Sequence, residues 1–439
     1  MNIESKKTGR IRARFHQFLE ADASGGVLLI ICTFAALLWA NSPFQDAYEH
    51  LLHSEIAIHI GSFHFEMHLL HWVNDVLMAI FFFVVGLEIK REIIAGELSS
   101  FKKAVFPALG AVGGMLFPAV LFVLLAGGRA GSQGWGIPMA TDIAFSLGIL
   151  SLLGKRVPLP LKVFLVALAI VDDLGAIVVI ALFYTSNLAV GYLYYALAIL
   201  AVMFVLNRKG VYKIYPYVIL GIVVWYFFYL SGIHATIAGV LVAFTIPIRR
   251  ELDEKVFNKT LTKISIDPSL ATPYTISDSD IHKIDHLRKN AKRVLSPVQY
   301  LEHKLHKLVN FFIMPVFAIA NAGVHLSSGN TGGEDYSYIS MCVGLSLLLG
   351  KTLGIVGIAW IGVKLKIAEL PSGIKWKQMF GVAMLGGLGF TMSLFISNLA
   401  YMDVAMLSAA KIGVLIGSTI AGVLGYCYLK ITLPEGKCA

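Results

Sequence analysis

Residues 104–128, AVFPALGAVGGMLFPAVLFVLLAGG, contain no Asp, Glu, Lys or Arg and decide the fold class. A helix needs about 20 predominantly apolar residues to cross the hydrocarbon core of a bilayer, and this stretch is longer. Four other stretches without a charged residue are comparable or longer: 174–207, 214–248, 308–333 and 378–402. The sequence therefore predicts an all-α polytopic membrane protein.

The composition of the whole chain agrees with this interpretation. Of its 439 residues, 57% are hydrophobic and only 14% are charged, and the mean hydropathy is +0.75. A soluble domain carries about 25% charged residues, because it has to cover its surface with them. The composition thus excludes a soluble enzyme, a disordered chain and a folded nucleic-acid-binding protein.

Hydropathy predicts twelve transmembrane helices. The net charge of +9 reflects basic residues that gather in alternate connections between them. By the positive-inside rule, this side and both termini are cytoplasmic. The predicted spans are about 23–41, 71–90, 104–126, 135–153, 159–184, 189–207, 213–230, 233–248, 308–325, 339–363, 378–399 and 406–429.

The spans divide the chain into three parts. Residues 1–248 hold an N-terminal cytoplasmic segment and helices 1–8, and residues 301–439 hold helices 9–12 and a short cytoplasmic tail. Between them, residues 249–300 form a polar cytoplasmic insertion, much longer than an ordinary connection. Residues 281–295 of this insertion are compatible with a short helix.

The first exterior connection contains a predicted β-hairpin at residues 56–67. Apolar residues alternate with others on both sides of Gly61-Ser62, and Gly in the first turn position is typical of a type II′ turn. This pairing puts Ile58 opposite Phe65. An isolated hairpin is only marginally stable in water, so its apolar face needs a partner, either a second copy of the chain or the membrane surface.

Four ionisable residues lie inside predicted spans: Asp142, Asp172, Asp173 and Lys351. Each costs about 2.5–3.5 kcal/mol at the centre of a membrane helix. A structural ion pair would account for Lys351 and one Asp, but two carboxylates would remain. Ionisable residues in membrane helices usually mark an ion pathway, and we interpret this group in the same way.

The adjacent pair of carboxylates indicates what kind of ion is handled. Asp172 and Asp173 point about 100° apart on a helix, so one can meet Lys351 while the other faces a cavity. Carboxylates this close titrate as a coupled pair. Their oxygens suit Na⁺ or Li⁺ and also bind protons, and Thr141 adds a hydroxyl oxygen beside Asp142. These residues therefore predict exchange of H⁺ for a small hard cation.

Two of the predicted spans have the composition of broken helices. Gly134, Gly136 and Pro138 precede Thr141-Asp142 in the fourth span, and the run 386–389, Gly-Gly-Leu-Gly, lies in the eleventh. These spans are seven apart, as expected if spans 3–5 and 10–12 are inverted repeats. Broken helices at matching positions are typical of the midplane site of a secondary transporter.

Taken together, these residues resemble the NhaA-type Na⁺/H⁺ antiporters. The resemblance runs from Ala23 to about Leu429 and includes two departures: Thr352 stands where the family usually has Pro, and Gln299-Tyr300 stand where basic residues are common. The motifs that carry it are Gly86-Leu87-Glu88-Ile89-Lys90-Arg91-Glu92, residues 138–145 (PMATDIAF), Asp172-Asp173-Leu174-Gly175-Ala176, residues 231–236 (SGIHAT) and Gly389-Phe390-Thr391-Met392-Ser393.

The resemblance implies roles for individual residues. Asp172 and Asp173 would form the ion and proton site, with Lys351 paired to Asp172. Thr141 and Asp142 would lie where the broken helices cross, opposite the half-helix dipole ends. The residues implied in the pH response are Glu88, Arg91, Glu92, Glu302, His303 and His306.

The resemblance also implies the setting of the protein. It would be a multi-pass protein of the bacterial inner membrane, a homodimer joined through the exterior hairpin, and in contact with membrane lipid. Its ligands would be the transported ions Na⁺, Li⁺ and H⁺; we expect no resident cofactor and no nucleic-acid partner.

The resulting hypothesis is a pH-regulated transporter, not an enzyme. It would exchange cytoplasmic Na⁺ or Li⁺ for external H⁺ electrogenically, by alternating access, and so serve sodium and pH homeostasis. Three alternatives remain. An organic-anion symporter predicts more cationic side chains near the crossing. An intramembrane aspartyl protease usually takes its two Asp residues from different helices, and a passive channel would carry Na⁺ independently of a pH gradient.

Overall fold

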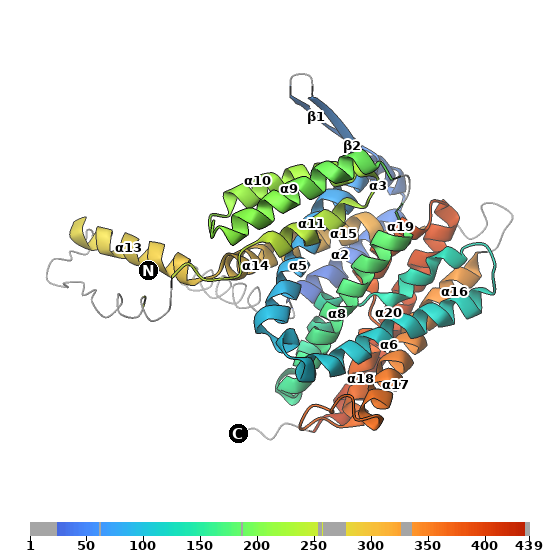
Figure 1. Cartoon of the computed structure of the whole chain (residues 1–439). Coiled ribbons are helices and arrows are strands. Elements are labelled where there is room, and N and C mark those ends of the chain that lie inside the picture. The colour runs from blue at the N-terminus through green and yellow to red at the C-terminus, as the bar shows by residue number, and fades with distance from the viewer. Residues whose placement is uncertain are drawn as a thin grey trace, which may run out of the picture. The chain divides into compact units, whose positions relative to one another are not determined.

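The computed structural model describes residues 24–60, 63–185, 188–252, 257, 278–325 and 336–434. Apart from one hairpin, the regular structure in these residues is helical, as Figure 1 shows, which confirms the all-α prediction. The chain forms two compact units. The first unit comprises Met1–Phe81, Glu92–Asn187 and Leu308–Ala439, and the second comprises Phe82–Arg91 and Leu188–Lys307.

Seven helical stretches in the described residues are long and apolar enough to cross a membrane. Four of them are single α-helices, and each of the other three consists of two α-helices joined by a π-helical turn. The three joined stretches are α4 (Leu69–His71) with η1 (Trp72–Leu77) and α5 (Met78–Ala95); α14 (Pro297–Leu308) with η6 (Val309–Ile313) and α15 (Met314–Ala322); and α16 (Ser337–Leu345) with η8 (Ser346–Gly350) and α17 (Lys351–Lys364). The other four are α6 (Phe101–Ala126), α8 (Leu159–Phe183), α9 (Val190–Arg208) and α20 (Val404–Thr432).

Bent helix pairs and two shorter helices occupy the remaining predicted positions. α2 (Ser24–Ala40) meets α3 (Gln45–Leu52) at 114°, and the shorter apolar helices are α10 (Tyr215–Ser231) and α11 (Ala235–Thr245). The other two bent pairs are the predicted broken helices: η3 (Ser132–Met139) with α7 (Ile143–Leu152), at 42°, and α18 (Trp376–Gly386) with α19 (Phe390–Ala400), at 45°. The polytopic class is therefore confirmed, whereas the number of twelve crossings stays a prediction.

The two breaks have different local causes. In the first, the 3-10 helix η3 contains Pro138 and ends at Met139, Ala140 is extended, and Asp142 then caps the N-terminus of α7. In the second, the chain leaves helical hydrogen bonding at Gly387 and resumes it at Phe390. Proline lacks a backbone donor and glycine stabilises a helix poorly, so both sequences favour interruption at these points.

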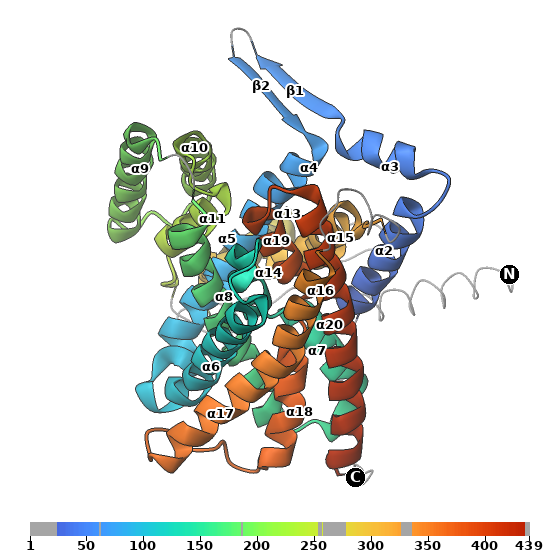
Figure 2. The same ribbon diagram turned by 90° about the vertical axis from the view of Figure 1, so that its right-hand side faces the viewer.

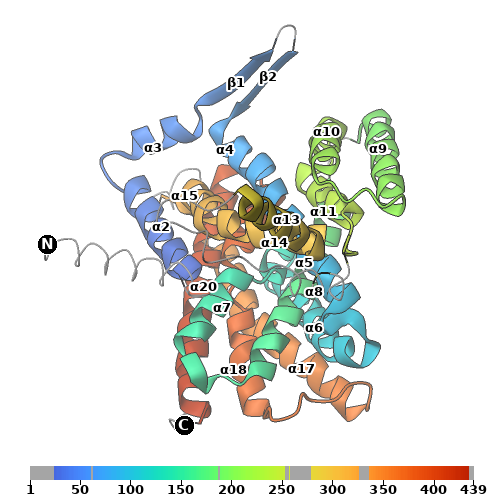
Figure 3. The same ribbon diagram turned by 90° about the vertical axis from the view of Figure 1, so that its left-hand side faces the viewer.

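In the first unit, helices distant in sequence pack side by side around the broken pairs. α6 packs against α8 and α17, and α20 packs against α16 and α18, an arrangement visible in Figure 2. α7 lies beside α18 and α20, as Figure 3 shows. The core between these helices is apolar and includes Phe164, Leu168, Ile355, Leu385 and Leu388.

The hairpin has the predicted register. β1 (Glu55–Ile60) pairs antiparallel with β2 (Phe63–His68), and Ile58 lies opposite Phe65. The predicted type II′ turn at Gly61-Ser62 lies outside the described residues. In the polar insertion, α13 (Asp278–Val294) forms where a short helix was compatible with the sequence.

Within the second unit, one buried lysine joins two helices. Lys90 Nζ donates to the backbone carbonyls of Phe244, at 2.6 Å, and Ile246, at the end of α11. These carbonyls lie in and just beyond the last turn of the helix, where no intrahelical donor is available. The sequence analysis did not identify Lys90 as a structural residue.

The contact between α6 and α17 depends on two glycines. A Cβ on Gly354 would clash with the carbonyl oxygen of Gly113 and would lie 2.6 Å from Phe117 Cβ. We therefore expect Gly354→Val to lower the free energy of unfolding by about 1–3 kcal/mol, the usual cost of overpacking. Thermal unfolding in detergent measures the change.

Gly357→Val on the same helix is the matched control, because nothing lies within 4 Å of a Cβ built at Gly357. Equal melting temperatures for the two valine variants would contradict the proposed packing constraint.

Candidate ion-binding site

Asp172 and Asp173 lie near the middle of α8, a helix of 25 residues. The helix begins after Pro158, and its sequence around the pair is otherwise apolar. Only 0% of Asp172 and 1% of Asp173 is exposed. Both predicted carboxylates are therefore enclosed by protein.

Lys351 forms the predicted ion pair with Asp172. Lys351 Nζ bonds Asp172 Oδ2, and both side chains are fully buried. A buried pair loses the hydration of both ions, so its stability depends on additional hydrogen bonds and on good geometry.

Thr141 supplies hydrogen bonds to both members of this pair. Its Oγ1 accepts from Lys351 Nζ at 2.7 Å and lies 2.6 Å from Asp172 Oδ2. The carbonyl oxygen of Gly386, at 2.9 Å, is a second acceptor for its single hydroxyl proton. Asp172 Oδ1 is also buried and has no hydrogen-bond partner within the described ranges. Carboxylate, hydroxyl and carbonyl oxygens thus converge beside one ammonium group.

Lys351 lies beside an irregular helical turn and close to a neighbouring helix. The π-helical turn η8 directly precedes Lys351, and π-helical turns are frequent at functional sites. At the departure from the family pattern, Thr352 Oγ1 donates to the carbonyl of Leu348 at 2.6 Å. On the neighbouring helix α6, a Cβ at Gly114 would lie 3.7 Å from Lys351 Cδ. That distance is an ordinary contact, and Gly114 instead makes room for Ile355, one turn after Lys351, because the same Cβ would lie 2.9 Å from Ile355 Cγ1.

Asp142 joins the N-termini of two half-helices. Its Oδ1 accepts from Phe145 N at 3.0 Å and so caps α7. Its Oδ2 accepts from Thr391 N at 3.1 Å and from Thr391 Oγ1 at 2.5 Å, in the first turn of α19. A carboxylate is favourable beside the positive ends of helix dipoles. Asp142 is therefore shared by both broken pairs.

Further hydrogen bonds hold the two broken segments together. Asp142 N donates to Leu388 O at 2.6 Å, and Ser146 Oγ donates to Leu385 O at 2.9 Å. On the other side of the crossing, Ser393 Oγ donates to Ile137 O at 2.7 Å. Each segment thus supplies partners for backbone groups that the break in the other leaves open.

Several members of this site were not predicted from the sequence. Thr391 appeared there only as part of a motif, and the carbonyls of Leu388 and Gly386 carry no side-chain signal. A threonine soon after a glycine-rich break is a helix-start signal, and this could have identified Thr391 as a polar group at a half-helix N-terminus. The predicted group Thr141, Asp142, Asp172, Asp173 and Lys351 is brought together.

The residues implied in a pH response are only partly brought together. Within the second unit, Arg91 Nη1 lies 3.0 Å from Glu302 Oε1, and His306 Nδ1 lies 3.7 Å from Glu88 Oε1. Glu92 instead accepts from the backbone N–H of Glu97 at 3.0 Å. His303 is exposed.

Known proteins resemble the chain along almost its whole length. A family model described as Na⁺/H⁺ antiporter 1 matches residues 16–429. The chain is 47% identical over 428 residues to the Na⁺/H⁺ antiporter NhaA of Oleidesulfovibrio alaskensis, covering 97% of this chain and 95% of that protein. A protein of the same name from Wolinella succinogenes is 45% identical over 428 residues, with 96% and 94% covered. Another, from Helicobacter pylori, is 44% identical over 432 residues, with 98% of each chain covered. The chain therefore belongs to the Na⁺/H⁺ antiporter 1 family.

Proposed function

We propose that this protein exchanges cytoplasmic Na⁺ or Li⁺ for external H⁺ across the inner membrane of a bacterial cell. The observation that carries the proposal is the buried group of Asp172, Asp173, Lys351 and Thr141 at the crossing of two broken helices. Family membership and the names of the relatives support the same activity. The protein would serve sodium and pH homeostasis, and its activity is transport rather than catalysis.

In the proposed cycle, protons and the cation compete for the same oxygens. Asp173 and Asp172 bind the cation when deprotonated and release it when they take up protons. Lys351 compensates the charge of Asp172 in the intermediate state in which Asp172 has lost its proton and no cation is bound yet, and Thr141 Oγ1 supplies a neutral oxygen ligand. A site with two carboxylates can release two protons for one monovalent cation, and such a cycle moves net charge and is electrogenic.

We propose that the crossing is the element that alternates between access states. Its two broken helices belong to spans 4 and 11, within inverted repeats of spans 3–5 and 10–12 in a chain of twelve spans. Asp142 would hold the two half-helix N-termini together while the surrounding helices move. Both termini and the insertion at 249–300 would face the cytoplasm, between the span groups 1–248 and 301–439.

We also propose that the ionic contacts of the second unit regulate exchange by pH. The contacts Arg91–Glu302 and His306–Glu88 combine fixed charges with a group that titrates near neutral pH. Glu92 and His303 neighbour them in sequence and complete the proposed group. The exterior hairpin at 56–67 would join two copies into a homodimer, in contact with membrane lipid.

The first test concerns the site. We expect Asp173→Asn to reduce Na⁺-driven and Li⁺-driven dissipation of a pH gradient in everted vesicles to background, because an amide cannot carry the exchanged proton. Asp172→Asn is a less decisive companion, because Lys351 can adapt. Asp46→Asn, at an exposed exterior carboxylate, is the control and should exchange like wild type.

Wild-type-like exchange by Asp173→Asn would refute the site assignment. A Na⁺ flux that is indifferent to the pH gradient would favour a channel.

The second test concerns the buried ion pair. Removing one partner of such a pair costs about 3–5 kcal/mol, because the other charge stays buried without compensation. We therefore expect Lys351→Met to lower the melting temperature in detergent more than the double variant Lys351→Met/Asp172→Asn does. If the double variant is less stable than Lys351→Met, and its loss of stability equals the sum of the losses in the two single variants, Lys351 and Asp172 do not form the ion pair described.

The third test concerns pH regulation. Protonated His306 attracts Glu88, and loss of the His306 proton as the pH rises removes this attraction. His306→Asn should therefore shift the activation midpoint of exchange toward acid pH. The shift should be below about one pH unit, since a half-exposed pair contributes about 0.2–1 kcal/mol.

His282→Asn, at an exposed histidine of α13, is the control and should leave the profile in place. An unchanged midpoint in His306→Asn would exclude this contact from regulation.

A further inference from the structure

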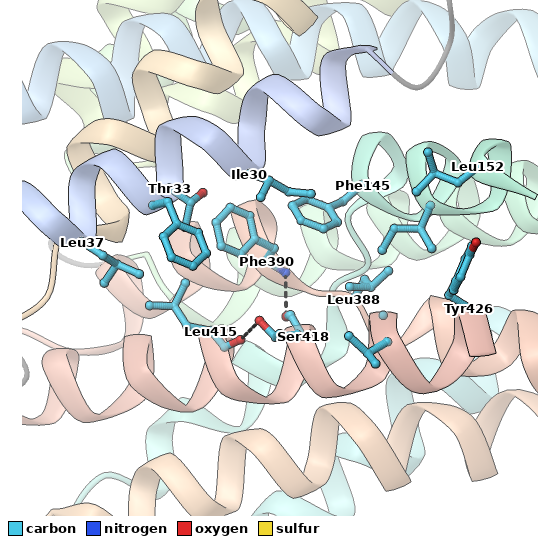
Figure 4. Close-up of a pocket in the computed structure, with 15 residues that line it drawn as sticks. Ile30, Thr33, Leu37, Phe145, Leu152, Leu388, Phe390, Leu415, Ser418 and Tyr426 are labelled. Carbon is cyan, nitrogen blue, oxygen red and sulfur yellow. Dashed lines mark hydrogen bonds between the residues drawn. The ribbon is translucent and has the colours of Figure 1, made fainter. Parts of the chain in front are cut away.

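An apolar groove of about 350 Å³ runs along the first unit between α2 and α20. Figure 4 shows α2 on one side, with Ile30 and Leu37, and α20 on the other, with Leu415. Leu388 and Phe390 lie between them, on the second broken pair. The groove therefore reaches the back of the crossing that holds the ion site.

The polar groups that line the groove are mostly engaged. Thr33 Oγ1 donates to Leu29 O at 2.8 Å, and Thr419 Oγ1 donates to Leu415 O at 2.7 Å. Ser418 Oγ accepts from Phe390 N at 3.2 Å. None of the lining residues carries a charge. The chemistry of the groove thus fits a hydrocarbon chain rather than a polar ligand.

The rim of the groove is apolar and open to the surroundings. Phe34, Leu152 and Val423 line it and are 63%, 59% and 57% exposed. In a polytopic membrane protein, exposed apolar helix faces meet lipid tails. An opening in such a face is filled from the bilayer, because leaving a hollow forfeits dispersion contacts.

One end of the groove is basic. Leu152 and Tyr426 lie at the same end in Figure 4. Lys155 and Arg156 follow Leu152 in the short helix η4 (Gly154–Arg156), and Lys430 Nζ lies 6.0 Å from the ring centroid of Tyr426. Basic residues that flank membrane helices attract anionic lipid headgroups, and tyrosine is typical of the headgroup level.

We propose that this groove binds one acyl chain of an anionic phospholipid, with its phosphate held by Lys155, Arg156 and Lys430. The apolar length of the groove selects the chain, and the basic end selects the headgroup charge. The bound chain packs against Leu388 and Phe390, which flank the second break. The site is independent of the proposed ion exchange and requires only that the chain spans a membrane.

Photo-labelling of the purified full-length protein in phosphatidylcholine liposomes tests this site. The probe is a trace of phosphatidylglycerol that carries a diazirine near the end of one acyl chain, and labelled residues are mapped by mass spectrometry. Label should concentrate on groove residues of α2, α7 and α20. It should exceed that of the matching phosphatidylcholine probe at least about fivefold, since each basic residue near an anionic surface contributes about 1 kcal/mol.

Two pairs of variants distinguish binding of the acyl chain from recognition of the lipid headgroup. Thr419→Trp fills the groove and should abolish the groove label, whereas Ile416→Trp, at a 54% exposed position of α20 outside the groove, should not. The triple variant Lys155→Gln/Arg156→Gln/Lys430→Gln should remove most of the headgroup preference. Lys364→Gln should not, although Lys364 also lies over an aromatic ring, at 4.9 Å from Trp360.

Three results would overturn the proposal. Equal labelling by both probes would leave only ordinary lipid contact, and label spread evenly over the lipid-facing helices would exclude a defined site. If residues 1–23 or a second copy of the protein can be cross-linked to the groove, and this cross-link blocks labelling, a protein segment occupies the groove instead of a lipid. If Thr419→Trp fails to fold, Leu152→Trp blocks the opposite wall and gives the same test.

Discussion

The structure of the first unit depends on the requirement that backbone polar groups within a membrane find partners inside the protein. Each broken pair leaves open N–H and C=O groups in the apolar interior, and the other pair supplies their partners. Asp142 is central, because its two oxygens cap α7 and receive the first turn of α19. Each break therefore depends on the other, because the open backbone groups of one broken pair find their hydrogen-bond partners in the other.

The arrangement of the proposed ion site follows from this crossing. Thr141 directly precedes Asp142 in the extended segment, so the same break that presents Asp142 to α19 presents the Thr141 hydroxyl to Asp172 and Lys351. The carbonyl of Gly386, at the end of α18, enters from the second break. A movement of either half-helix would change the oxygen ligands around the carboxylates. In the proposed exchange, ion binding and helix movement would therefore be coupled through Thr141 and Asp142, which are adjacent in the chain.

Sequence patterns predicted the features that depend on neighbouring residues in the chain and missed those that depend on packing between distant segments. Charges in apolar runs identified Asp172 and Lys351, glycine and proline identified the breaks, and alternation identified the hairpin. Thr391 was missed because its bond to Asp142 spans 249 residues of chain. The π-helical turn before Lys351 has no sequence signal that separates it from an α-helix. His303 is exposed because it lies about 100° around its helix from Glu302, which meets Arg91.

The geometry also separates the proposed exchange from a proteolytic function. An aspartyl dyad needs two carboxylates that face one another and share a proton. Here Asp172 Oδ2 is engaged by Lys351 and Thr141, and both oxygens of Asp142 accept hydrogen bonds from half-helix N-termini. Asp173 is adjacent to Asp172 on one helix and points away from it by about 100°. A lysine that compensates one carboxylate suits a site that must tolerate repeated loss and gain of protons and cations, whereas it would disable a shared-proton dyad.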